Sequence, residues 1–172
     1  MELAIKNKWI SLGGSSTVQD MSGNDVMRVK GKVFSFTQKK FVTDLNDTVK
    51  FIVRNKFWKL FVYRAFVMDP QENIIATVRR KVFSLHDRYF VTSPERGDLE
   101  IIGNILQFNY KILKDGKEIG HVARKISLRD SYVLTIDDSF DYEYMVALVI
   151  AIDNITDRRD SDSSSSSFSS ND

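Results

Sequence analysis

The sequence predicts a mainly β fold, an antiparallel closed barrel of about twelve strands around a hydrophobic C-terminal helix. Three observations lead to this prediction: short alternating segments recur along the chain, turn residues separate them, and one late apolar run does not alternate. Alternation of apolar and polar residues is the pattern of a strand with one face buried, and a segment that is apolar all round is typical of a buried helix.

The first observation is a repeated unit that contains a motif of the form Lys-Val-Phe-Ser-Phe or Leu. Its copies are separated by 24, 24, 25, 23 and 21 residues. Each copy joins two alternating segments that are rich in β-branched and aromatic residues. The motif copies begin at Lys8, Lys32, Lys56, Lys81, Asn104 and Lys125.

The second observation is the turn chemistry between these segments. The sequences DPQEN (69–73), SPERGD (93–98) and KDGKE (114–118) carry the Pro, Gly, Asn and Asp residues that favour turns. The pair Asp115-Gly116 is a strong hairpin signal. Six copies of a two-strand unit give about twelve short strands, and a closed barrel leaves none of them as an exposed edge.

The third observation is the stretch from Tyr144 to Ile152, nine residues without a charged or amide side chain. We expect a helix from Ser139 to Thr156, about 27 Å long, that fills the barrel. Either Asp138 or Ser139 is the expected N-cap. A final buried strand and a short transmembrane segment are the alternatives, although the run is shorter than the roughly 20 residues that a bilayer requires.

The chain divides into a folded domain, residues 1–156, and a tail, residues 157–172. The tail reads DRRDSDSSSSSFSSND and contains almost no apolar residues. Such a composition cannot bury enough surface to offset the entropy of ordering, so we expect the tail to be disordered.

The repeated motif, the stretch NIIATVRRKVFSLHDRYFV (73–91) and the closing ALVIAIDNI (147–155) resemble the LURP-one-related family. This family belongs to the Tubby-like C-terminal domain superfamily, with tubby proteins and phospholipid scramblases as relatives. The resemblance covers about residues 3–156 and implies a barrel of twelve strands around a hydrophobic helix. It also implies a connection with membranes, because tubby proteins bind phosphoinositide head groups and scramblases act on lipids. The lipid-contacting motif of tubby proteins is not recognisable in this chain.

The sequence offers no catalytic constellation. The chain has no cysteine and two histidines, His86 and His121, which are too few for a typical zinc site. The sequence SLHD (84–87) brings Ser, His and Asp together on one turn, where triad geometry is rare. Gly13-Gly14 lacks the context of a phosphate-binding loop. We therefore expect neither enzymatic activity nor a cofactor.

The recurrent chemistry is cationic. Residues 1–125 hold 22 Lys and Arg against 13 Asp and Glu, a net charge of +9, whereas residues 126–172 hold 3 against 10, a net charge of −7. The Lys that opens the motif and the residue two positions before it share a face of the strand, and the alternate positions are apolar. The sequence therefore predicts an outward basic band and an anion-binding site. The candidate anion-binding residues are Lys30, Lys32, Arg54, Lys56, Arg79 and Lys81.

These features predict a non-enzymatic binding or regulatory domain. The expected partner is an anionic phospholipid surface, and the expected location is the cytoplasm with peripheral attachment to membranes. Nucleic acid and an unknown protein are the alternative partners, because a basic surface with aromatic residues suits all three. Repeat ancestry, with each Lys serving only to solubilise its strand, explains the same pattern without any ligand.

Overall fold

The computed structural model describes residues 1–6, 15–31, 37–56, 63–81, 87–104, 109–124 and 131–166. Within these ranges it contains twelve strands and one helix, which confirms the predicted fold class. The elements are β1 (Glu2–Lys6), β2 (Ser15–Asp20), β3 (Asp25–Gly31), β4 (Lys40–Thr43), β5 (Val49–Asn55), β6 (Arg64–Met68), β7 (Ile74–Arg80), β8 (Asp87–Thr92), β9 (Leu99–Asn104), β10 (Asn109–Lys114), β11 (Lys117–Arg124), β12 (Ser131–Ile136) and α1 (Tyr142–Ser166).

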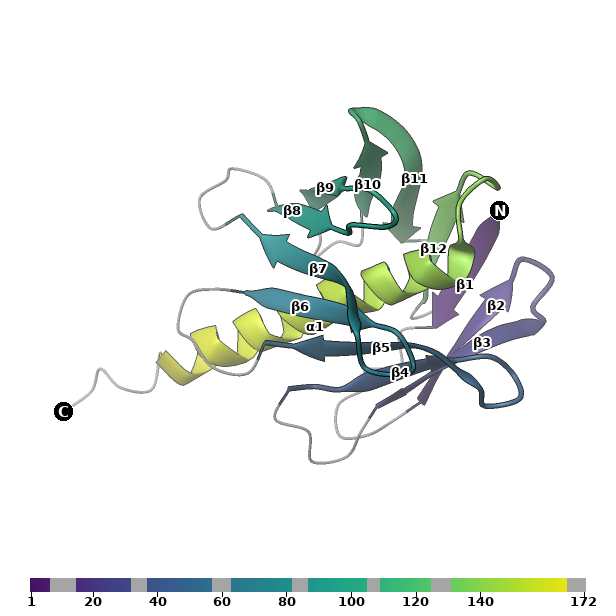
Figure 1. Ribbon diagram of the computed structural model, residues 1–172, viewed down its shortest axis with the longest axis horizontal. Coiled ribbons are helices and arrows are strands. Elements are labelled where there is room, and N and C mark those ends of the chain that lie inside the picture. The colour runs from purple at the N-terminus through teal and green to yellow at the C-terminus, as the bar shows by residue number, and fades with distance from the viewer. Residues whose placement is uncertain are drawn as a thin grey trace.

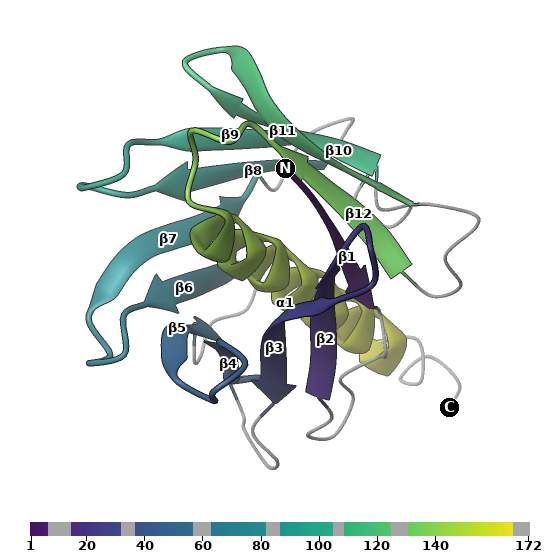
Figure 2. The ribbon, with the colours of Figure 1, turned by 90° about the vertical axis from the view of Figure 1, so that its right-hand side faces the viewer.

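The strands form one closed sheet in which every strand pairs with its neighbours in the chain. Closure comes from β1, which pairs antiparallel with β12 and places Ile5 opposite Tyr132. Figure 1 shows the helix running lengthwise inside this sheet, and Figure 2 shows the strands as a ring around it. Because the sheet closes on itself, none of the described strands presents an unpaired edge.

The hairpin turns contain a second repeat, which the alternation of apolar and polar residues does not reveal. In three turns an Asp carboxylate accepts the backbone N–H of the residue four positions later, at 2.8 to 2.9 Å. The residue three positions after each Asp has a positive φ. This geometry corresponds to a type I turn closed by a left-handed residue. The aspartates are Asp20, Asp44 and Asp69, and the left-handed residues are Gly23, Asp47 and Glu72.

The C-terminal apolar run is a helix, as predicted, and not a strand, but its two ends differ from the prediction. The N-cap is Asp141, whose Oδ1 accepts the backbone N–H of Tyr144 at 3.1 Å, instead of Asp138 or Ser139. The helix also continues to Ser166, beyond the expected end at Thr156. Neither Gly nor Pro occurs after Thr156 to stop it. It therefore enters the segment predicted to be disordered, while the domain boundary at residue 156 stays a prediction.

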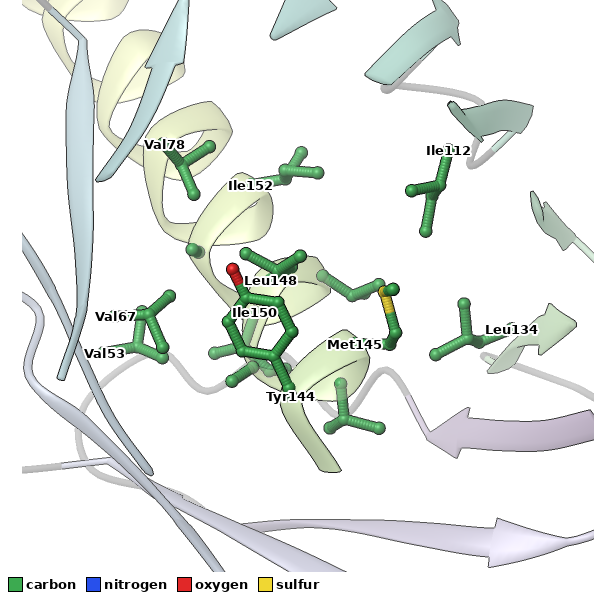
Figure 3. Packing of buried hydrophobic residues seen from close by; sticks show 14 of the residues in the cluster. Val53, Val67, Val78, Ile112, Leu134, Tyr144, Met145, Leu148, Ile150 and Ile152 are labelled. Carbon is green, nitrogen blue, oxygen red and sulfur yellow. The ribbon is translucent and has the colours of Figure 1, made fainter. Parts of the chain in front are cut away.

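The interior of the barrel is filled by α1 and by the inward side chains of the strands. Leu148, Ile150 and Ile152 are at most 2% exposed. Figure 3 shows these helix residues between valines of β5 to β7 on one side and Ile112 and Leu134 on the other. Burying each such side chain contributes about 1.5 to 3 kcal/mol. The helix is thus part of the hydrophobic core.

Candidate anion-binding surface

Strands β5 to β8 carry cations on their outer face. Ala65 and Val67 of β6 are fully buried in the core. Since successive side chains of a strand point to opposite faces, Arg64 and Phe66 face outward. The same argument applies to β5 and β7, where Val53 and Val78 are fully buried next to Arg54 and Arg79. The outward orientation predicted for these cations follows from the observed burial pattern.

The register of the sheet aligns three cations in one row. Arg64 of β6 lies directly opposite Arg79 of β7. The backbone N–H of Lys56 donates to the carbonyl oxygen of Arg64 at 2.9 Å, so Lys56 continues the row next to the end of β5. On the other side of Arg79, β8 contributes Phe90 in the same row. Like charges directly opposite each other on a sheet are unfavourable, so the facing pair Arg64 and Arg79 is electrostatically strained in the absence of an anion.

Aromatic rings support these guanidinium groups. Arg54 lies over the ring of Phe66 with 5.2 Å between Cζ and the ring centroid. Arg79 lies over the ring of Phe90 at 5.9 Å. Both rings belong to the neighbouring strand in register with the arginine. The attraction between a cation and the face of a ring limits the orientations of each guanidinium.

Other outward cations, in contrast, have carboxylate partners. The Nζ of Lys30 is 2.7 Å from Oδ1 of Asp47, and this contact lowers the pKa of Asp47. Lys39 pairs with Glu72 at 2.5 Å, and Arg88 pairs with Glu100 at 2.9 Å.

Four cations of the β5–β8 face have no carboxylate partner among the described residues. They are Arg54, Arg64, Arg79 and Lys81. The segments that connect β5 to β6 and β7 to β8, residues 57–62 and 82–86, contain no Asp or Glu. We refer to the outward cations Arg54, Lys56, Arg64, Arg79, Lys81 and Arg88 as the basic wall.

Four of the six residues predicted to bind anions belong to the basic wall. Lys30 lies on β3 instead, where Asp47 neutralises it, and Lys32 is outside the described residues. The predicted band is therefore interrupted by an acidic residue between β3 and β5. Most of the repeated Lys motif also lies outside the described residues.

Sequence reasoning missed Arg64 and Arg88. Both lie near the beginning of the second strand of a unit. The repeated Lys motif, in contrast, identifies cations at the end of the first strand. In an antiparallel hairpin the end of the first strand and the beginning of the second are neighbours. The signal in the sequence that could have identified Arg64 and Arg88 is therefore a cation directly after the connection between the two strands.

The interior of the barrel contains a second polar cluster, which joins α1 to β4 and β5. Lys40, only 4% exposed, forms an ion pair of 3.0 Å with Asp153 of the helix. Asn55 Nδ2 donates to the carbonyl oxygen of Asn154 at 2.9 Å, and Asn154 Nδ2 donates to that of Gln38 at 2.9 Å. These bonds connect the helix to one side of the barrel wall. We call Lys40, Asp153, Asn55, Asn154 and Gln38 the polar clasp.

Buried tyrosines face the same part of the helix. Burial raises the pKa of Tyr110 well above its usual value, and the nearby Asp153 carboxylate acts in the same direction. Tyr89 is fully buried, and its hydroxyl lies 3.5 Å from the Thr156 hydroxyl. A tyrosine with a raised pKa stays neutral, so Tyr110 does not supply a nucleophile at neutral pH.

The described residues contain no group of three or more His, Cys, Asp or Glu side chains with the arrangement of a metal site. His86 lies outside them, and Asp87 pairs with Arg80 at 3.0 Å. Within the same part of the chain, no helix combines the length and the apolar character needed to cross a bilayer.

The geometry thus defines a class of protein, a closed twelve-stranded β-barrel with a helix in its interior and a basic exterior wall. A model of the LURP-one-related family matches residues 1–153, and the chain belongs to this family. This finding confirms the resemblance seen in the sequence.

Two plant proteins and one solved structure are similar to the chain. The protein LURP-one-related 13 of Arabidopsis thaliana is 29% identical over 154 residues, which cover 81% of this chain and 79% of the relative. LURP-one-related 15 of the same plant is 23% identical over 178 residues and covers 90% and 80% of the two chains. An X-ray structure of an Arabidopsis thaliana protein superimposes with a TM-score of 0.66 at 21% identity and covers 90% of each chain, which supports the fold.

Proposed function

We propose that this protein is a non-enzymatic binding domain that associates peripherally with anionic phospholipid surfaces through the basic wall. The observation that carries the proposal is the row of Lys56, Arg64 and Arg79 on neighbouring strands, in which neither arginine has a described carboxylate partner. An anionic surface would relieve the repulsion between the two arginines, and each cation near such a surface contributes about 1 kcal/mol.

The aromatic residues of the wall support the choice of a lipid surface. Phe66 and Phe90 are half-buried under Arg54 and Arg79, so apolar and cationic groups alternate on one side of the barrel. Such a mixture suits the boundary between head groups and acyl chains, where amphipathic side chains keep their charged ends in water.

The test is co-sedimentation of the full chain with neutral and anionic vesicles at low and physiological salt. The variant Arg54→Glu/Arg79→Glu reverses two charges on the wall. The matched control Lys6→Glu/Lys111→Glu changes the net charge equally on β1 and β10, outside the wall. We expect binding to anionic vesicles that weakens with salt. The wall variant should bind about tenfold more weakly or worse, and the control should bind nearly as the parent does.

Equal losses in the two variants would show that net charge alone drives binding and would reject the wall as the site. No binding of the parent protein at either salt concentration would reject a lipid role altogether. Preferential, more salt-sensitive binding to a single-stranded polynucleotide would assign the wall to nucleic acid instead.

A further inference from the structure

Within the basic wall, Arg64 and Arg79 are two arginines directly opposite each other on paired strands. They are register partners on β6 and β7 and face the same side of the sheet. Directly opposed residues on one face of a sheet have Cβ atoms about 4.5 to 5.5 Å apart. Their guanidinium groups can therefore reach a single small ligand between them.

The surroundings of this pair favour an anion over any other ligand. The Nε of Arg64 is buried and has no hydrogen-bond partner among the described residues. A buried donor of a charged group that lacks an acceptor is costly, more so when a second cation lies opposite. The ring of Phe90 lies against the guanidinium of Arg79 and restricts its orientation, which reduces the entropy lost when a ligand is bound.

We propose that Arg64 and Arg79 form a phosphate clip that binds a phosphomonoester dianion, an inference that rests on the proposed function for its place on a membrane. Each guanidinium presents a planar fork of N–H donors, which matches two oxygens of a phosphate. Two such forks require a ligand with at least three free oxygens and a charge close to −2. A terminal phosphate carries about −1.5 to −2 at neutral pH and has three free oxygens.

Competing anions fit the clip less well. A phosphodiester carries one charge and has two free oxygens, and a carboxylate likewise has two oxygens and one charge. Either can satisfy one fork but leaves the second arginine with only part of its donors paired. The clip therefore distinguishes phosphomonoesters from the diesters of ordinary anionic phospholipids by oxygen count and charge.

The sharpest test compares vesicles that contain phosphatidic acid, a monoester, with vesicles that contain phosphatidylglycerol, a diester, at equal surface potential. We expect the full-length protein to prefer phosphatidic acid by about tenfold, the equivalent of one additional charge-assisted contact. The variant Arg64→Lys/Arg79→Lys keeps every charge but removes both forks. It should bind both vesicles alike and keep its salt dependence.

A matched control changes Arg28, which lies on β3 outside the basic wall and pairs with Asp47. The variant Arg28→Lys should keep the preference for phosphatidic acid. Thermal melting of each variant checks that the barrel is intact. A parent protein that binds both vesicles equally overturns the clip and leaves the lipid-binding proposal standing. A parent that binds neither vesicle overturns the proposed function and the clip together.

The phosphate could belong to a lipid or to a soluble molecule. A second binding experiment distinguishes these two sources. Inorganic phosphate is added to protein bound to phosphatidic acid vesicles, with sulfate at equal ionic strength as the reference. Release by millimolar phosphate but not by sulfate indicates a clip that recognises the free group. Retention in both salts, together with the monoester preference, indicates that the group is bound only as a lipid head group. Loss of the preference in Arg28→Lys but not in Arg64→Lys/Arg79→Lys would overturn the assignment to this pair.

Discussion

At the scale of single residues, the buried ion pair between Lys40 and Asp153 is sensitive to substitution of either partner. Its two charges lie between the barrel wall and the helix, with Nζ and Oδ2 3.0 Å apart. Desolvation makes such pairs weak contributors to net stability, but each partner becomes costly when the other is removed. The pair is therefore suited to fixing the depth of the helix in the barrel.

The substitution Lys40→Met should lower the free energy of unfolding by about 3 kcal/mol, because Asp153 then loses its counter-charge in a largely buried site. The double variant Lys40→Met/Asp153→Leu should recover most of that loss, since neither charge remains. Urea denaturation followed by circular dichroism measures both. If the double variant were as unstable as the sum of the two single changes, the two residues would not act as a pair.

Arg96 has a comparable role at the other end of the helix. Its Nη1 lies 2.7 Å from Oδ2 of Asp141, the helix N-cap, and its guanidinium lies over the ring of Tyr144 at 4.5 Å. Arg96 thus links the turn between β8 and β9 to the first turn of α1. The polar clasp and Arg96 connect the helix to the barrel at both ends of its buried part.

At the scale of elements, the three Asp turns define the hairpins of the first half of the barrel. In each turn the N–H of the left-handed residue donates to the carbonyl oxygen of the Asp at 3.0 to 3.2 Å. Two of the left-handed residues, Asp47 and Glu72, also pair with Lys30 and Lys39 on the outer face. Each of these two five-residue turns thus connects the strands of a hairpin and also neutralises a cation elsewhere on the sheet.

These turns predict a loss of stability in acid. Hydrogen bonds from Asn24, Thr48 and Asn73 lower the pKa values of Asp20, Asp44 and Asp69, respectively, below their usual value. A carboxyl group with a depressed pKa in the folded state contributes stability above its unfolded pKa of about 4, and this stability disappears as the pH falls through the lower folded value.

The melting temperature should therefore decrease as the pH is lowered from about 5 to about 3. In the variant Asp20→Asn/Asp44→Asn/Asp69→Asn the decrease should be smaller, because three of the groups that take up protons on unfolding are absent. The measurement is differential scanning calorimetry across this pH range. Parallel curves for the parent and the variant would show that these carboxylates do not control the acid sensitivity.

At the scale of the whole molecule, charge is distributed unevenly along the barrel. The Asp turns lie towards the right-hand end of Figure 1, whereas Lys56, Arg79 and Lys81 lie at the opposite ends of their strands. The C-terminal part of α1 projects from this second end (Figure 1). An asymmetric charge distribution orients a protein as it approaches a charged surface. The basic end, together with the tail, would then face an anionic membrane.

The tail, residues 157–172, should weaken vesicle binding, because it carries four Asp against two Arg. Deleting it raises the net charge from +2 to +4, and the affinity for anionic vesicles at low salt should increase by up to about tenfold. A full-length variant with the four Asp changed to Asn separates the effect of charge from that of the segment itself. Vesicle titrations at two salt concentrations provide the comparison, and equal affinities for all three proteins would exclude competition by the tail.

Much of the fold could be predicted from local patterns. The twelve strands follow from period-two alternation, and the core positions Val53, Val78 and Val122 follow from the phase of that alternation. The buried helix follows from a run that is apolar on every side. These features depend on neighbours in the sequence, so the chain by itself determines them.

The candidate site could be predicted only in part, because it depends on register. The outward phase of Arg54 and Arg79 could be predicted from alternation alone. The bulges in β2 to β7 leave this phase intact because they lie near the Asp turns, as between Val67 and Met68. The position of Arg64 opposite Arg79 required the pairing of β6 with β7. The neutralisation of Lys30 by Asp47 likewise depends on where the turn after the next strand of the chain comes to lie.

The sequence by itself thus determined the kind of protein: its strands, its turns, its internal helix and the excess of cations in its first 125 residues. Only the tertiary structure decided which charges meet and which stay without a partner. Alternation and apolarity are patterns of a few neighbouring residues, so they can be recognised in the sequence itself. Which residues lie opposite each other across the sheet, and which distant segments form ion pairs, is decided only when closure of the barrel fixes the register of every strand.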